Sequence, residues 1–500
     1  MAINDTSRFP APVYAETVLA PLFEGAKRYY RHHFQRVDRA HLVMLAETGV
    51  LDAATAAAIG GALVEIERDL DVEALTYTGE VEDFFFLIEA ELKRRLGADI
   101  AGRLHTGRSR NDIDHTLFKL ALKGRIDALS AKARGLARSL LDTARRERAT
   151  LIVAYTHGQP AQPTTFGHYL AAAIEVLLRD LARLQAARAI VDLCPMGAAA
   201  ITTTGFPIAR HRMAELLGFP APLQNSYSCI AAVDYVTSTY AALELMMLHL
   251  GRLVQDFQFW SSFEVGQLYV PNAFVQISSI MPQKRNPVPI EHLRLLASHA
   301  MTRARSMLTV THNTPFTDMN DSEGETQGQG YAAFDLAGRV LDLLSGLVAA
   351  VTIDGDKVRR NIDRSCITVT ELADSLVRIE GLSFRQAHEI AAATAKAVVA
   401  AGASLAEAGF APFGQAFAET CGRPSTVDGA RFREIVSPEH FVAVRARFGG
   451  PAPEPLDKAF AGYAAVLETF AANAATAADR EKGASAMLES CFDIVLKGQG

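Results

Sequence analysis

Cysteine is rare in this chain of 500 residues, which contains only five. They form no CxxC pair, and an odd number of scattered cysteines is typical of a reducing compartment. The first twenty residues lack a basic segment that leads into an apolar run, so the sequence predicts no signal peptide. No uncharged apolar stretch of about 18 residues exists, which argues against a membrane span. We therefore expect a cytoplasmic protein without disulfides.

Dense basic blocks are also missing. The net charge is −6 and the basic residues are spread along the chain, which makes nucleic acid an unexpected partner. The nucleotide, zinc-protease and hydrolase patterns GxGxxG with a following acid, GxxxxGK[ST], HExxH and GxSxG do not occur. These absences favour an acid/base reaction on a carboxylate-bearing small molecule, with no cofactor and no metal.

Strand-like alternation is scarce, whereas the helical period dominates. Apolar residues recur at steps of three and four over 163–193, 230–257, 289–310 and 331–353, and each segment is long enough for a bundle. A short hairpin is expected around Ala198 to Phe206, where ITTTG interrupts the helical pattern. The sequence therefore predicts an all-α fold with a long central helical bundle.

Turn-forming residues divide the chain into three mostly helical regions. We expect an N-terminal helical domain over 1–104, a long-helix bundle over 105–360 and a C-terminal helical domain over 361–500. Long helices that are apolar on several faces need partners on each face, and one chain supplies few of them. Subunit association is therefore expected.

Three polar segments interrupt this pattern. The first is LHTGRSRNDIDHT, Leu104 to Thr116, in which arginine and amide donors follow a glycine. The arginine fork matches both oxygens of a carboxylate, so Ser109, Arg110 and Asn111 are candidate substrate-binding residues. The alternative is a solvated helix start with Thr106 or Ser109 as N-cap, which composition alone favours.

The second segment is AYTHGQPAQPTTFGH, Ala154 to His168, where Thr156 and His157 precede a turn and a helix expected from Pro163. A histidine at such a place can act as an acid or a base near neutral pH, although a capping or packing role fits equally well.

The third segment is SSIMPQKRNPVPIE, Ser278 to Glu291. A serine hydroxyl is a poor base unless its anion is stabilised, and Lys284, the N–H groups of a tight loop or a helix N-terminus can each supply that. The alternative is a surface loop with one salt bridge.

Together the three segments resemble the argininosuccinate lyase branch of the fumarase/aspartase superfamily. HTGRSRND, THGQPAQP and SSIMPQKRNP occur in the family's order, and weaker likenesses extend over most of the chain. The resemblance implies a homotetramer with a twenty-helix core and active sites built from three subunits. The implied reaction is a reversible β-elimination of fumarate from an N-substituted aspartate such as argininosuccinate.

The resemblance also implies roles for the polar residues. Ser278 would take the Cβ proton, while Lys284 and Asn286 would hold the carboxylate as negative charge builds on it. His157, paired with Glu291, would lie close to the leaving nitrogen. The remaining predicted contacts with the substrate are Ser109, Arg110, Asn111, Thr156, Ser279, Met281 and Gln327.

Several positions depart from the family pattern. Phe85 stands near the place of a histidine, Val233 replaces an arginine, and Ile277 replaces a glycine before the serine pair. Near the N-terminus, Val37 and Asp38 stand where the family has Gly-Ser. All of these positions except Ile277 belong to the motifs that the resemblance assigns to binding of the amine.

The segment Thr314 to Asp335 departs further, because it contains no lysine and has four acidic residues within eight positions: Asp318, Asp321, Glu323 and Glu325. An acidic pocket suits a cationic amine better than the carboxylate of arginine, unless these side chains face water. A lyase with a changed amine site, similar to ethylenediamine-N,N′-disuccinate lyase, is therefore the alternative. A silent structural relative or a helical scaffold explains the polar segments less well.

Overall fold

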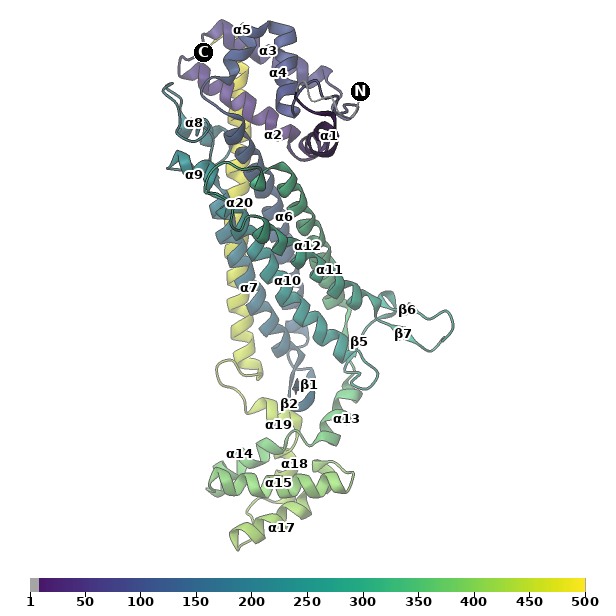
Figure 1. The fold of residues 1–500 in the computed structure, drawn as a ribbon. Coiled ribbons are helices and arrows are strands. Elements are labelled where there is room, and N and C mark those ends of the chain that lie inside the picture. The colour runs from purple at the N-terminus through teal and green to yellow at the C-terminus, as the bar shows by residue number, and fades with distance from the viewer. Residues whose placement is uncertain (1–8, 500) are drawn as a thin grey trace.

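The structure is a computed structural model that describes residues 9–499, and it is an elongated stack of helices with a few two-stranded pairs (Figure 1). Short helices lie at each end and long helices form the middle. The predicted all-α class is confirmed. Within residues 9–499, no helix has both the length and the hydropathy that crossing a bilayer requires.

Five long helices form the bundle, and they pack against one another along their lengths. Sequence periodicity predicted four of them, with bounds that differ by several residues. The fifth, α6, begins just after Ser109, which is its N-cap. Their bounds are α6 Arg110–Arg146, α7 Phe166–Val191, α10 Asp234–Trp260, α11 Val288–Val310 and α12 Gly324–Ala350.

The apolar spacing of these helices explains the packing. On α10, residues three and four positions apart are almost fully buried, namely Leu243, Met246, Met247, Leu250 and Val254. Three helices meet most closely at Gly330 of α12, where an added Cβ would lie 2.1 Å from Tyr240 Oη on α10 and 2.9 Å from Met307 Cε on α11. Glycine is therefore required there for the helices to approach.

The N-terminal helices pack around the start of α6. They are α1 Pro12–Tyr14, α2 Ala20–Glu47, α3 Ala53–Asp69, α4 Phe84–Leu96 and α5 Ala98–Gly102. Two short helices, α8 Arg210–Leu216 and α9 Ser226–Ala231, lie between α7 and α10 in the chain. The apolar side chains of α2, α3 and α4 join the same core as the bundle.

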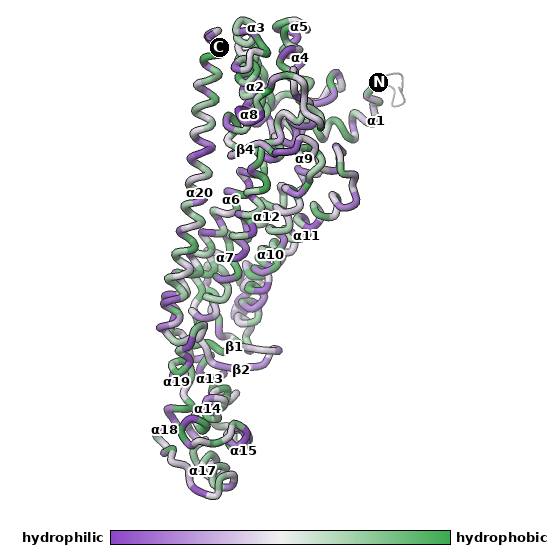
Figure 2. Tube along the Cα trace, turned by 90° about the vertical axis from the view of Figure 1, so that its left-hand side faces the viewer, coloured by the Kyte–Doolittle hydropathy of each residue, from purple (hydrophilic) through white to green (hydrophobic). Residues whose placement is uncertain are grey.

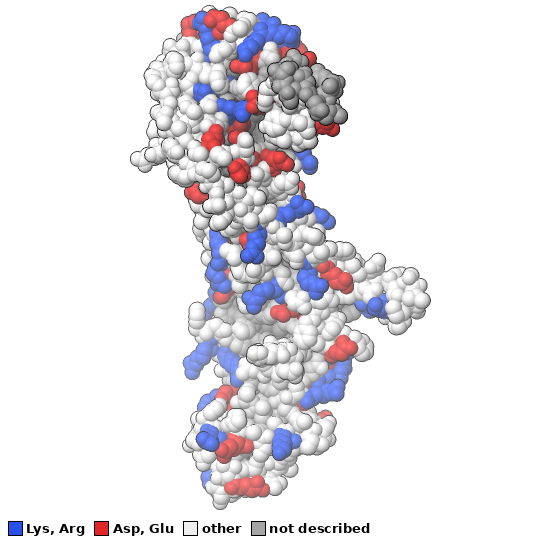
Figure 3. Space-filling view, viewed as in Figure 1, with Lys and Arg blue, Asp and Glu red and all other residues white. Residues whose placement is uncertain are grey.

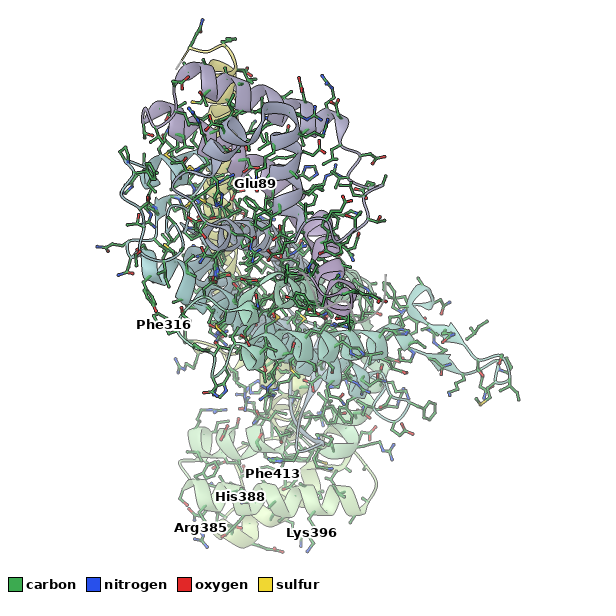
Figure 4. The ribbon with its side chains drawn as sticks, turned by 45° about the horizontal axis from the view of Figure 1, so that its top comes forward. Glu89, Phe316, Arg385, His388, Lys396 and Phe413 are labelled. Carbon is green, nitrogen blue, oxygen red and sulfur yellow. The ribbon has the colours of Figure 1, made fainter. Side chains whose placement is uncertain are left out.

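The C-terminal helices form a smaller unit with its own core at the opposite end of the molecule. Phe413 lies among these helices, whereas Arg385 and Lys396 point outward (Figure 4). Their bounds are α13 Gly355–Ser365, α14 Val369–Glu380, α15 Phe384–Ala400, α16 Leu405–Ala408, α17 Phe410–Cys421, α18 Gly429–Ile435 and α19 Pro438–Ala443.

The last helix, α20 (Pro453–Leu496), leaves this unit and runs back along the bundle to the N-terminal helices (Figures 1 and 2). A largely buried ionic network holds it there: Glu481 accepts from Lys123 at 2.9 Å and from Arg188 at 3.0 Å. The predicted C-terminal range 361–500 therefore spans two separate packing environments.

Two hairpins extend from the bundle. β1 (Leu151–Thr156) pairs with β2 (Gln159–Thr165), and β6 (Gln276–Ile277) pairs with β7 (Arg285–Asn286). They leave the bundle in different directions (Figures 1 and 2). The other pairs are β3 (Leu193–Cys194) with β4 (Ala221–Pro222) and β5 (Leu268–Tyr269) with β8 (Thr352–Ile353).

The predicted hairpin around Ala198 to Phe206 is wrong, because that segment consists of turns. Ala199, Ala200 and Thr203 have φ values of 46°, 76° and 60°, which an extended strand does not allow. The helix expected from Pro163 is also corrected: β2 continues to Thr165, which caps α7 by accepting the N–H of His168.

Gly330 offers a direct test of the bundle packing. Gly330→Ala forces Cβ into the Tyr240 hydroxyl, so we expect a loss of about 1–3 kcal/mol in the free energy of unfolding. Gly346→Ala is the matched control on the same helix, because its nearest neighbour lies 4.0 Å away, and it should leave stability unchanged or raise it. Thermal denaturation of both variants measures this, and equal midpoints would show that the close approach is unimportant.

Candidate active site

The first polar segment forms the start of α6, where Ser109 is the N-cap. Its N–H donates to Asp112 Oδ1 at 2.9 Å, and the other oxygen of Asp112 accepts the N–H groups of Gly197 and Ala199, both at 2.9 Å. One buried carboxylate thus ties the helix start to the loop after β3. The capping role predicted as the alternative for Ser109 is therefore real.

Arg110 already has anionic partners within the chain. Its Nη1 lies 2.7 Å from Glu82 Oε1 and 3.1 Å from Asp83 Oδ2. Among residues 9–499, its Nη2 and Nε make no hydrogen bond, so two donor groups of the fork are open to a substrate carboxylate. Arg110 is partly exposed, as a substrate-binding arginine must be.

Asn111 links this helix start to the unusual acidic segment. Its Nδ2 donates to Ala200 O at 2.9 Å and to Asp318 Oδ2 at 3.1 Å. Burial raises the pKa of Glu323, and the nearby charges of Arg110 and Asp83 also act on it. Asp321 and Glu325 are exposed. The structure therefore brings two of the four acidic residues to the site and leaves the other two in solvent.

Two departures from the family pattern meet beside this site. Arg108 is buried, pairs with Asp38 at 2.6 Å and lies over the Phe85 ring, 5.8 Å from its centroid. A buried ion pair of this kind needs both partners, since removing one leaves an uncompensated charge. Asp38 and Phe85 therefore provide a structural environment for Arg108, the first arginine of the segment Leu104 to Thr116.

The second polar segment is the tip of the β1–β2 hairpin. His157 and Gly158 form its two-residue turn with φ values of 54° and 73°, as a type I′ turn requires. Thr156 and His157 are both exposed. This hairpin follows the end of α6, and a helix of 37 residues spans about 55 Å. Within one chain, His157 is therefore far from Arg110.

The third polar segment is the loop of the projecting β6–β7 hairpin, whose surface is mostly uncharged (Figure 3). Ser278 Oγ accepts the N–H of Met281 at 3.0 Å and the N–H of Ile280 at 3.4 Å. N–H donors aimed at a hydroxyl oxygen stabilise its deprotonated form, which is what a serine base requires. The sequence predicted this kind of support from a tight loop.

The remaining predicted residues of this segment are available to a ligand. Ser279, Met281 and Lys284 are exposed on the loop, Asn286 ends β7, and Glu291 lies in the first turn of α11. Among the described residues, Lys284 Nζ has no hydrogen bond or ion pair. Glu291 does not meet His157 within the chain, so their predicted pairing requires a second subunit.

Gln327 lies elsewhere, inside the bundle. It is fully buried on α12, one turn after Glu323, and its Nε2 lies 3.4 Å from Tyr235 Oη. Tyr235 in turn bonds His115 Nδ1 at 3.1 Å. Substrate contact by Gln327 stays a prediction, and its present role is to support the start of α12.

Three further carboxylates lie near Arg110, and the sequence motifs predicted no role for them. Glu82 and Asp83 precede α4, and Asp114 lies one helical turn after Arg110, on the same face of α6. Burial raises the pKa of Asp114 well above its usual value, and Glu323 and Asp83 raise it further. Burial also raises the pKa of Asp83 and of Glu323. The i, i+4 spacing of Arg110 and Asp114 was the signal in the sequence.

Comparison with known proteins places this geometry in a family. Residues 26–302 match the family described as lyase, and residues 366–443 match the argininosuccinate lyase C-terminal family. The protein named argininosuccinate lyase 2 of Agrobacterium fabrum is 68% identical over 489 residues, which cover 98% of this chain and 97% of the relative. The chain belongs to the argininosuccinate lyase family. It is a carbon–nitrogen lyase that releases fumarate.

Other relatives agree with this assignment. The argininosuccinate lyase of Methanoculleus marisnigri is 37% identical and covers 84% of each chain. The structure of EDDS lyase in complex with formate has a TM-score of 0.84 at 27% identity and covers 97% of each chain. A class II fumarase from Schistosoma mansoni, at 16% identity, 85% and 91% coverage and a TM-score of 0.65, shares the fold.

Arg285 is expected to position the Ser278 loop of this lyase. Its Nη2 donates to Val270 O at 2.7 Å, its Nη1 contacts Asn272, and it lies 5.1 Å from the Tyr269 ring centroid. We expect Arg285→Ala to lower kcat about tenfold with little change in KM, and Arg285→Lys to recover part of the loss. Steady-state kinetics test this, with Arg385→Ala on the remote C-terminal unit as control. A loss of thermal stability that accompanies the fall in kcat would instead indicate a general folding defect.

The raised pKa of Asp114 predicts a stability effect with a definite sign. A carboxyl whose pKa is higher in the folded than in the unfolded state loses stability as pH rises. Asp114→Asn should therefore denature at a higher temperature than wild type at neutral pH, and the difference should vanish below about pH 4.

Asp112→Asn is the matched control on the same helix. Burial raises the pKa of Asp112 as well, but its two oxygens hold three N–H groups and the substitution replaces one of these oxygens by an amide nitrogen, so it should destabilise at neutral pH. Denaturation midpoints across pH measure both variants. A lower midpoint for Asp114→Asn at neutral pH contradicts the electrostatic account.

Proposed function

We propose that the substrate is an N-(1,2-dicarboxyethyl) amine bound between subunits, with argininosuccinate, cleaved to arginine and fumarate, as the first candidate. The Ser278 loop is the observation that carries this proposal, because two backbone N–H groups donate to the hydroxyl oxygen of the half-buried Ser278, and the exposed Lys284 belongs to the same loop. The 68% identity to a protein named argininosuccinate lyase 2 supports the choice of substrate.

In the proposed reaction, Ser278 takes the Cβ proton of the succinyl half. The electron pair of the C–H bond passes into the neighbouring carboxylate, and this dianion then expels the amine as the C–N bond breaks. The ammonium of Lys284 and the amide of Asn286 stabilise the dianion, since their charge and donors are fixed before it forms. His157, oriented by Glu291, delivers a proton to the leaving nitrogen.

Binding of the succinyl half is assigned to the other polar residues. Arg110 presents its two open donor groups to a carboxylate, and the α6 N-terminus adds the Ser109 hydroxyl. The Asn111 amide joins them by exchanging its bond to Asp318 for one to the substrate. The hairpin tips contribute Thr156, Ser279 and the backbone at Met281. Gln327 would reach the substrate only if the start of α12 shifts.

A homotetramer is part of the proposal, because one chain does not bring these groups together. Three subunits would each contribute one segment, and a twenty-helix core would result from four copies of the five-helix bundle. Exposed leucines on the bundle, such as Leu245 and Leu248 of α10 and Leu295 of α11, support burial against other copies. All five cysteines are free, which agrees with work in the cytoplasm.

The amine half is the second question, and the charges around Arg110 favour an alternative substrate. Asp318 and Glu323 come from the segment that lacks a lysine, and they join Glu82 and Asp83 at the start of α6. This excess of negative charge suits an amine without a carboxylate. An ethylenediamine-N,N′-disuccinate type of substrate is therefore the second candidate.

Comparison of the two substrates separates the candidates. Fumarate formation is followed by ultraviolet absorbance with argininosuccinate and with ethylenediamine-N,N′-disuccinate in parallel. A much higher kcat/KM for argininosuccinate supports the first candidate, and the reverse order supports the changed amine site. Absence of fumarate from both at micromolar enzyme concentration contradicts the proposed function.

The catalytic roles are tested on the same loop. We expect Ser278→Ala and Lys284→Met to lower kcat by several orders of magnitude, at about 1.4 kcal/mol for each tenfold. Gln283→Ala changes an exposed neighbour with no assigned role and should retain most activity. Turnover measurements on the three variants decide this. A Ser278→Ala enzyme with near-wild-type kcat removes Ser278 as the base.

A further inference from the structure

A small cavity lies behind Arg110, between the N-terminal helices and the start of α12. Its volume is about 110 Å³, which is enough for a ligand larger than one water molecule. Aromatic and aliphatic side chains form much of the wall, among them Leu22, Phe84 and Phe118, while Arg110 lies at its edge. The cavity therefore extends the predicted substrate site away from the succinyl half.

Four carboxyl groups line the same cavity: Glu82, Asp83, Asp114 and Glu323. One guanidinium opposes them, and it is engaged by Glu82 and Asp83. Four acids against one base leave an excess of negative charge in a space of low polarity, which is costly unless protons or a cation compensate. A neutral or anionic ligand would not relieve this excess.

Asp114 is the group without a partner. Among the described residues it has no hydrogen bond and no ion pair, although Asp83 and Glu323 on neighbouring elements lie close to it. The Asp114 side chain is partly buried, and part of its surface borders the cavity. A carboxyl that borders an open space and has no partner among the described residues is available to a ligand.

We propose that this cavity binds the cationic end of the amine half, with an ammonium or similar group against Asp114 and its carbon chain against Phe84 and Phe118. Asp114 is then a specificity-determining residue for amines that carry a second positive charge. This inference rests on the proposed function, since it assumes that the succinyl half lies at Arg110.

The spacing along α6 fits this arrangement. Asp114 follows Arg110 by four residues, which corresponds to about 6 Å along the helix axis on one face. An amine whose reacting nitrogen lies near the succinyl half needs a spacer of only a few carbons to reach Asp114. Aromatic faces add attraction for the cation, because their electron-rich surfaces favour positive charge.

The test uses propane-1,3-diamine and propylamine as probes, which differ in the second ammonium. Calorimetric titration of the assembled protein, without fumarate, should show at least tenfold tighter binding of the diamine. Asp114→Asn should remove most of that difference, and Glu323→Gln should remove part of it. Glu325→Gln is the matched control, because Glu325 is an exposed acid of the same segment.

The outcomes separate the inference from the proposed function. Equal affinity for both probes in wild type, or an unchanged preference in Asp114→Asn, overturns the cation site and leaves the carboxylates as partners of Arg110 only. A diamine preference that depends on Asp114, in an enzyme that forms no fumarate from either succinyl substrate, supports the cation site and contradicts the proposed function instead.

Discussion

The length of α6 separates the polar segments of this chain and limits how they can form an active site. Arg110 begins the helix, the β1–β2 hairpin follows its far end, and the β6–β7 hairpin projects from the side of the bundle (Figure 1). A rigid helix of about 55 Å keeps the first two apart in any single chain. Chemistry that needs all three segments therefore depends on contacts between copies.

This constraint explains why the predicted catalytic groups lie in turns that project from the bundle. Ser278, Lys284 and His157 occupy tight turns whose backbone geometry is fixed locally, by the Met281 N–H and by the two residues of a type I′ turn. Each turn is thus defined within a single chain, and the proposed assembly only brings the turns together. The amine side differs, because Asp83, Asp114 and Glu323 converge with Arg110 inside one chain. In the proposed function, the fumarate chemistry is assembled between chains, whereas the choice of amine is made within one chain.

The sequence was informative where local patterns determine structure. Period predicted four bundle helices, capping offered Thr106 or Ser109 as N-cap, of which Ser109 is the observed one, and the ordered motifs predicted the family. It failed where backbone conformation overrides residue type: the left-handed residues Ala199 and Thr203 prevent the expected strand. Tertiary contacts were also beyond reach, since the pairing of Arg108 with Asp38 joins residues seventy positions apart. The path of α20 along the bundle was beyond reach for the same reason, because it depends on tertiary contacts.

Activity from mixed subunits tests the central claim of a shared site most directly. Arg110→Ala and Ser278→Ala enzymes, each inactive alone, are unfolded together in equal amounts and refolded. If Arg110 and Ser278 of one site come from different chains, random mixing restores about a quarter of wild-type activity, because both contributing subunits must be intact at their positions. A mixture as inactive as either variant refolded alone would contradict the shared site.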